Sequence, residues 1–240
     1  MKNERTIASR LFRKIKGRIS PIIDESDEYT DLLAGANAGW LERGNLHAIS
    51  YSIKNLPSDA PIIEIGSFCG LSTNLITYYK EKHGRNNRLI NCDKWVWNFE
   101  DRYIGNSAMT VKEYLSFALD AYKRNVRLFS RSDLPETIKE FSDDFFSLWR
   151  AGRQVEDIFG KSVTLGGPIS FCFIDGNHDY DFAKRDFQNT DEFLESGGFI
   201  LFDDSADGTE WEVARVREEV IRTNRYEIVM KNPNYLFRKK

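Results

Sequence analysis

The sequence is poor in cysteine, has no excess of basic residues and contains no long apolar run. Its three cysteines, Cys69, Cys92 and Cys172, show none of the paired spacings of zinc sites. An odd number of cysteines without a signal peptide predicts buried thiols in a reducing cytoplasm. The formal net charge of −3 argues against a nucleic-acid partner. Because no apolar run approaches the roughly 18 residues that span a bilayer, we expect a soluble protein.

The length and composition favour one α/β domain with additional segments. The chain has 240 residues, 41% of them hydrophobic and 30% charged, which is ordinary for a globular protein. We find no internal repeat and no linker that would split the chain. We therefore divide it into a helical N-terminal extension, 1–56, and one domain, 57–240, with insertions near 95–112 and 150–167.

The N-terminal segment 8–19 differs from the rest of the chain in its basic charge. Its apolar residues recur at near-helical spacing among five lysines and arginines. Such a helix can pack against its own domain or against a partner subunit, which would make the protein a homo-oligomer. Alternatively, it can lie on an anionic membrane surface as a peripheral contact.

Apolar runs of strand length alternate with amphipathic segments along the remainder of the chain. This alternation is typical of a doubly wound α/β fold with a mostly parallel sheet. We predict strands at 61–67, 88–93, 126–132, 169–175 and 197–204, with helices at 72–84, 110–125, 134–149, 181–196 and 210–224. The last residues, 225–240, predict an antiparallel hairpin around Asn-Pro-Asn, which completes a seven-stranded Rossmann-like sheet.

Polar residues follow the predicted strands at the edge where such sheets bind ligands. In the loop after the first strand, Gly66 and Gly70 let the backbone approach a ligand, and Ser72 or Thr73 can cap the next helix. A dinucleotide fingerprint is absent, because Phe68 stands where its second glycine would be. The second strand ends in a carboxylate that can accept hydrogen bonds from a ribose diol, so a nucleoside fits better than a nucleotide.

These motifs resemble the class I S-adenosylmethionine-dependent methyltransferases. "EIGSFCGLST" is similar to the first motif of that family, Asp93 to its ribose-binding acid and "GGFILFDD" to its strand before the active site. Within this superfamily, the run from Asp175 to Tyr180 and the pair Gly39-Trp40 resemble the macrocin and mycinamicin sugar O-methyltransferases, which have a catechol-type core. The resemblance covers about residues 37 to 230.

The resemblance implies a binding site for S-adenosylmethionine. The loop 66–73 would hold the methionine part of this cofactor and Asp93 its ribose. Glu64 would orient the loop or bind the amino group, and residues after the third strand would flank the adenine. The implied cofactor-binding residues are Glu64, Gly66, Ser67, Gly70, Ser72, Thr73, Asp93, Ser132 and Asp133.

Three carboxylates, Asp175, Asp203 and Asp204, end neighbouring predicted strands and could converge. An oxygen-rich cluster suits Mg²⁺, which in the related enzymes chelates a vicinal diol and lowers the pKa of the hydroxyl. Asp175 would thereby take part in catalysis, and His178 would act as the base. The alternative is that Asp203 and Asp204 cap the next helix while Asp175 bonds to loop amides.

The sequence therefore predicts a metal-assisted O-methyltransferase that acts on a hydroxyl of a sugar, a glycoside or a phenol. The aromatic segment that begins at Trp95 could close over the cofactor and the acceptor, or pack against the sheet. Two alternatives remain. The first is a nicotinamide-dependent oxidoreductase, and the second is a non-catalytic subunit with the same fold that recruits a partner through its N-terminal helix.

Overall fold

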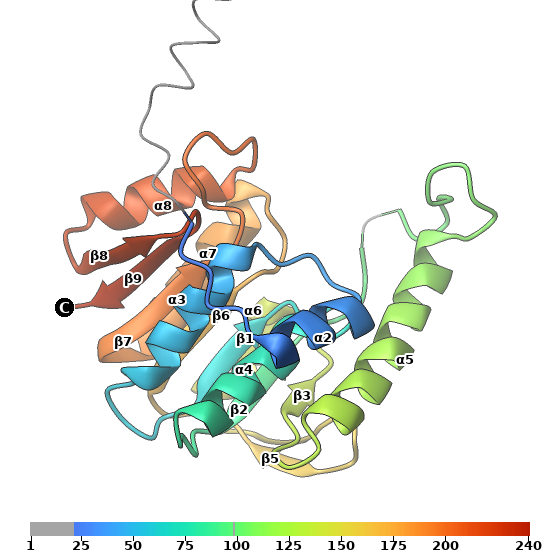
Figure 1. Ribbon diagram of the computed structural model, residues 1–240, viewed down its shortest axis with the longest axis horizontal. Coiled ribbons are helices and arrows are strands. Elements are labelled where there is room, and N and C mark those ends of the chain that lie inside the picture. The colour runs from blue at the N-terminus through green and yellow to red at the C-terminus, as the bar shows by residue number, and fades with distance from the viewer. Residues whose placement is uncertain (1–21, 98) are drawn as a thin grey trace, which may run out of the picture.

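The computed structural model describes residues 22–97 and 99–240 (Figure 1). The helix predicted at 8–19 lies outside the described residues. Two helices, α2 (Glu28–Ala36) and α3 (Arg43–Lys54), precede the first strand. In the part of the chain that the structure describes, no helix combines the length and the apolar character needed to cross a membrane.

A seven-stranded sheet forms the centre of the molecule. Its strand order is β3-β2-β1-β6-β7-β9-β8, in which the first five strands are parallel and β9 runs antiparallel to both of its neighbours, β7 and β8. The predicted Rossmann-like fold and its C-terminal hairpin are confirmed. The strands of this sheet are β1 (Ile62–Ile65), β2 (Leu89–Cys92), β3 (Glu136–Ile138), β6 (Ile169–Ile174), β7 (Leu194–Phe202), β8 (Tyr226–Lys231) and β9 (Tyr235–Lys239).

Helices cover both faces of the sheet because successive strand residues point to opposite sides. In β1, Ile63 and Ile65 join an apolar cluster with side chains of α6 (Ser142–Arg150), α7 (Tyr180–Phe193) and α8 (Val213–Arg222). Ile62 joins a second cluster with α2, α3 and α4 (Leu71–Lys82). Figure 1 shows α3 and α4 on the near side of the sheet and α7 behind it.

The third strand lies further along the chain than the sequence predicts. The segment 126–132 was predicted as a strand, but most of it continues α5 (Val111–Phe129), and β3 begins only at Glu136. The helix predicted at 134–149 begins at Ser142. The reason is that α5 has a capping box at Thr110 and one continuous buried stripe that ends at Val126.

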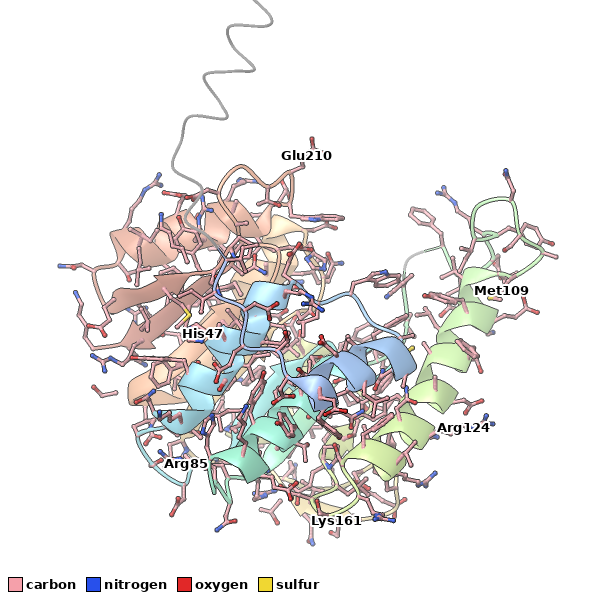
Figure 2. The ribbon with its side chains drawn as sticks, viewed as in Figure 1. His47, Arg85, Met109, Arg124, Lys161 and Glu210 are labelled. Carbon is pink, nitrogen blue, oxygen red and sulfur yellow. The ribbon has the colours of Figure 1, made fainter. Side chains whose placement is uncertain are left out.

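The two segments predicted as insertions lie outside the main sheet. Within 150–167, β4 (Gln154–Glu156) and β5 (Ser162–Thr164) form a separate antiparallel pair. Residues 99–110 fold back through a bridge between Tyr103 and Thr110. Met109, which is close to this bridge, lies at the outer edge of the molecule (Figure 2).

Candidate active site

The loop after β1 brings two strand ends into contact. Gly66 has φ +85°, and an ideal Cβ there would lie 2.0 Å from the carbonyl oxygen of Asp175 in the loop after β6. Only glycine fits such an approach. Gly70, in the left-handed conformation, is the N-cap of α4 and makes no side-chain cap. The predicted capping by Ser72 or Thr73 is therefore wrong, because both residues lie inside the helix.

Glu64, near the end of β1, stabilises this loop through hydrogen bonds to its buried carboxyl. Its Oε2 accepts hydrogen bonds from Ser67 Oγ (3.1 Å), Thr73 Oγ1 (2.5 Å) and Asn91 Nδ2 (2.6 Å). Complete burial raises the pKa of the Glu64 carboxyl to about 7, against the opposing effect of the hydroxyl donors. Glu64 does not line the cleft described below, so its contacts act on the shape of the loop.

Asp93 follows β2 and binds the same loop from the side. Its Oδ2 accepts hydrogen bonds from the backbone N–H groups of Ser67 (2.8 Å) and Phe68 (3.0 Å), and its Oδ1 accepts from Trp95 N–H (2.7 Å). Burial raises the pKa of Asp93, although these three donors favour the charged form. A carboxylate has about four acceptor positions, so one remains for a ligand hydroxyl.

The carboxyls that follow β6 and β7 are in direct contact. Burial raises the pKa of Asp175, and the hydrogen-bonded carboxyl of Asp203 raises it further. Asp203 is held in place by the side-chain amides of Asn45 and Asn234, each of which donates to its Oδ1 at 2.6 Å. Its pKa is also raised, chiefly by burial. Two ionised carboxylates would repel each other here, which favours a proton or a cation at this pair.

Asp204 is turned toward His178 instead of toward this pair. Asp204 has φ +51°, and its Oδ2 lies 3.1 Å from His178 Nδ1. At this distance the two groups form an ion pair whenever the imidazole is protonated. Trp211 packs on the imidazole with 5.0 Å between ring centroids. The imidazole is thereby oriented by one carboxylate and one indole.

The predicted metal ligands do not form a finished coordination site. Asp175 and Asp203 meet, whereas Asp204 is engaged with His178. Within 22–97 and 99–240, no group of three His, Cys, Asp or Glu side chains is arranged to hold a metal ion.

A cleft with a volume of about 1510 Å³ opens beyond the carboxyl ends of β1, β2, β6 and β7. This volume exceeds the range of about 300–1,000 Å³ that is usual for a single small ligand. The cleft therefore has room for two molecules side by side. The predicted site residues that line it are Gly66, Ser67, Ser72, Asp93, Asp175, His178, Asp203 and Asp204.

Residues 63–205, more than half of the chain, match a family described as "methyltransferase domain". The chain belongs to this family. Its membership confirms the resemblance to S-adenosylmethionine-dependent methyltransferases noted in the sequence. No curated protein has a sequence that matches this methyltransferase.

Solved structures with the same fold include several O-methyltransferases. One from Bacillus cereus, in complex with SAH, aligns with a TM-score of 0.56 and 14% identity over 96% of this chain and 97% of the other. TomG from Streptomyces achromogenes, involved in tomaymycin synthesis and bound to SAM, aligns with a TM-score of 0.53 and 14% identity over 100% of this chain and 99% of the other. CalS11, a TDP-rhamnose 3′-O-methyltransferase of calicheamicin biosynthesis, aligns with a TM-score of 0.51 and 15% identity over 99% of this chain and 95% of the other. At such low identity, these similarities establish the fold.

Two of the residues predicted to flank the adenine are not in the cleft of this methyltransferase. Ser132 and Asp133 precede β3, so they lie at the opposite edge of the sheet from the cleft, and Asp133 pairs with Lys80 at 2.5 Å. They precede β3 because this strand begins later in the chain than the sequence predicts. The residues that do follow β3 and line the cleft include Glu140, Phe141 and Ser142.

Asp186 is a cleft residue that the sequence did not reveal. It lies on α7, is only 3% exposed, and its Oδ1 has no hydrogen-bond partner among the described residues. Burial raises the pKa of this carboxyl to about 7, although Ser142 donates a hydrogen bond to it. In the sequence, a single aspartate on an amphipathic helix carries no signal that it is buried, so only the tertiary structure identifies it.

We expect Asp186→Asn to stabilise this methyltransferase more at high pH than at low pH. An acid whose pKa rises from 3.8 to about 7 on folding keeps its proton while the unfolded chain loses it, so stability falls as pH rises through that interval. Removing the acid should yield a gain on the order of 2–4 kcal/mol by pH 8. Urea unfolding at pH 5 and pH 8 measures this gain in the free energy of unfolding. Asp120→Asn, at an exposed position on α5, is the control. If the difference in the free energy of unfolding between Asp186→Asn and wild type were the same at pH 5 and pH 8, the prediction would be contradicted.

Proposed function

We propose that this methyltransferase transfers a methyl group from S-adenosylmethionine to a hydroxyl oxygen of a small molecule such as a sugar, a glycoside or a phenol. One observation carries the proposal: a single cleft joins the glycine loop and Asp93 to Asp175 and an oriented His178. The first two form a nucleoside-binding half, and the last two form an acid–base half.

The nucleoside-binding half is built from the first two strand ends. When bound, S-adenosylmethionine supplies a methyl group on a sulfonium that is already activated for transfer. Asp93 would accept a hydrogen bond from a ribose hydroxyl through its remaining acceptor position. The loop from Gly66 to Gly70 lets the backbone approach the methionine part, and Phe68, with φ +42°, is held in this shape by Asp93.

The acid–base half would remove the proton of the acceptor hydroxyl. The neutral imidazole of His178 would accept the proton on a ring nitrogen, and Asp204, with Oδ2 3.1 Å from Nδ1, would stabilise the imidazolium that forms. The acceptor oxygen then forms a bond to the methyl carbon while the bond from carbon to sulfur breaks, and the proton leaves His178 for solvent. Positioning of the hydroxyl in the cleft would carry most of the remaining rate.

We further propose that Asp175 and Asp203 bind Mg²⁺. Both residues line the cleft and supply the oxygen ligands that this ion prefers, and a cation would offset the repulsion between them. Asp204 would serve as a ligand through water or through the oxygen that does not contact His178. When bound, the metal would lower the pKa of the acceptor hydroxyl.

Calorimetry and a methylation assay test both proposals together. We expect one equivalent of S-adenosylmethionine to bind with or without Mg²⁺. We also expect methyl transfer to a member of a panel of vicinal diols, lost on adding EDTA and restored by Mg²⁺. Absence of cofactor binding would overturn the proposed function. Turnover that resists EDTA would overturn only the metal proposal.

Asp93→Ala should weaken binding of S-adenosylmethionine. Loss of the carboxylate leaves a ribose hydroxyl unpaired, which costs about 1–3 kcal/mol, or roughly a 5- to 150-fold increase in Kd. It also frees the backbone donors of Ser67 and Phe68. Calorimetric titration of the variant gives the change, with Asp133→Ala as a matched control outside the cleft. An unchanged Kd in Asp93→Ala would contradict the ribose assignment.

A further inference from the structure

The cleft that binds the two substrates has a strongly acidic wall. Apart from Asp93, Asp175, Asp186 and Asp203, six further carboxylates line it: Glu42, Glu140, Asp143, Asp144, Asp179 and Asp204. Of these six, Glu140 pairs with Lys94 and Asp143 pairs with Arg185. The lysines and arginines among its lining residues, as far as the structure describes them, are Arg43 and Lys94. Carboxylates remain in excess even after the cationic cofactor and a divalent metal are bound.

Both cations in the wall are already neutralised. Arg43 pairs with Asp24 and with Asp31, each at 2.9 Å. Lys94 pairs with Glu140 at 2.6 Å, and its ammonium group also lies over the ring of Phe141. An acceptor with a phosphate group would therefore meet no unpaired lysine or arginine among the described lining residues, and its charge would be repelled.

Aromatic rings line the same cleft with open faces. Trp40, 69% exposed, stacks on Phe68 with 4.8 Å between centroids and 20° between planes. Trp97 continues the stack on Phe68 at 6.5 Å, and Trp211 is 53% exposed where it packs on His178. Exposed indole faces beside a catalytic base provide stacking surfaces for a ring, and they attract cations as well.

We propose that the methyl acceptor is a ring compound that carries a basic amine, and that nucleotide-linked or phosphorylated sugars are excluded. This inference rests on the proposed function, since it concerns the second substrate of the same cleft. Asp179 is the carboxylate closest in sequence to His178, and no described lysine or arginine pairs with it. Asp179 is therefore assigned as a partner of the amine.

Three catechols that differ in charge test the proposal without knowledge of the natural acceptor. Dopamine is cationic, 4-methylcatechol is neutral and 3,4-dihydroxybenzoate is anionic, while all three share one ring and one vicinal diol. Calorimetry with protein saturated with SAH should give dopamine a Kd at least tenfold lower than that of 3,4-dihydroxybenzoate, with 4-methylcatechol between them. The ratio should shrink at high salt. Thymidine diphosphate should not bind at a concentration of about 1 mM, at which a ligand with a binding free energy of about −4 kcal/mol half-saturates its site.

Two variants distinguish a specific role of Asp179 from the general electrostatic attraction of the acidic cleft. Asp179→Asn should reduce the preference for dopamine about threefold, and Asp120→Asn, on the exposed face of α5, should leave it unchanged. Equal affinities, a preference for the anion, binding of thymidine diphosphate or binding of none of the catechols would overturn the proposal. An unchanged ratio in Asp179→Asn would overturn the assignment of that residue. Failure to bind SAH would instead overturn the proposed function.

Discussion

Replacing His178 by alanine should lower kcat by about 10² to 10⁴, the usual contribution of a positioned general base. The reason is geometric: Asp204 Oδ2 lies 3.1 Å from Nδ1 and Trp211 packs on the ring, so the imidazole has a defined position in the cleft. The affinity for S-adenosylmethionine should not change, because the partners of His178 among the described residues are Asp204 and Trp211, not Asp93 or the loop that would bind the cofactor. Steady-state kinetics and calorimetry on the same preparation measure both quantities.

His47→Ala is the matched control for this substitution. His47 lies on α3, pairs with Glu25 at 2.9 Å and does not line the cleft (Figure 2). Its removal should leave kcat within about twofold of wild type, since substitutions away from a site act on stability and little else. Full activity of His178→Ala would mean that another residue acts as the general base. Equal losses in both variants would mean that the loss arises from folding and not from catalysis.

Gly66→Ala should destabilise the protein by about 2–4 kcal/mol, because a left-handed conformation for alanine costs on the order of 1 kcal/mol and a backbone clash adds about 1–3 kcal/mol. The new Cβ would lie 2.0 Å from the carbonyl oxygen of Asp175, so the loops after β1 and β6 would have to separate. For a chain of this size we expect Tm to fall by roughly 4–16 °C. Binding of S-adenosylmethionine should be lost as well.

Gly84→Ala isolates the conformational part of that effect. Gly84 also has a positive φ, +62°, but nothing lies within 4 Å of an ideal Cβ there. Gly84→Ala should therefore lower the free energy of unfolding by only about 1 kcal/mol. Thermal unfolding of the two variants side by side gives the comparison, and equal shifts in Tm would contradict the close approach of the two loops.

Several elements could be predicted because their signals are local. Buried strands such as β1, "IIEI", and β6, "ISFCFI", are short apolar runs, and each is followed within two residues by glycine or aspartate. In a parallel sheet the ends of such strands meet at one edge, so the predicted positions of Gly66, Asp93, Asp175 and Asp203 in one cleft follow from connectivity alone.

The third strand could not be predicted in the same way. β3 has three residues, "ETI", and its Glu136 is buried against Arg88 and Lys161, which come from distant parts of the chain. Apolar residues at the end of α5 were instead read as a strand, because Val126 and Leu128 also satisfy a period of two. This displaced the predicted adenine contacts to Ser132 and Asp133.

The sequence by itself determined the α/β fold, the family and the edge of the sheet where the site lies, because periodicity and strand ends are properties of neighbouring residues. Only the tertiary structure decided that Asp204 contacts His178, that Asp175 contacts Asp203, and that Asp186 is buried beside the cleft. The orientation of a side chain and the pKa of a carboxyl depend on burial and on partners far away in the chain, and no local pattern records them.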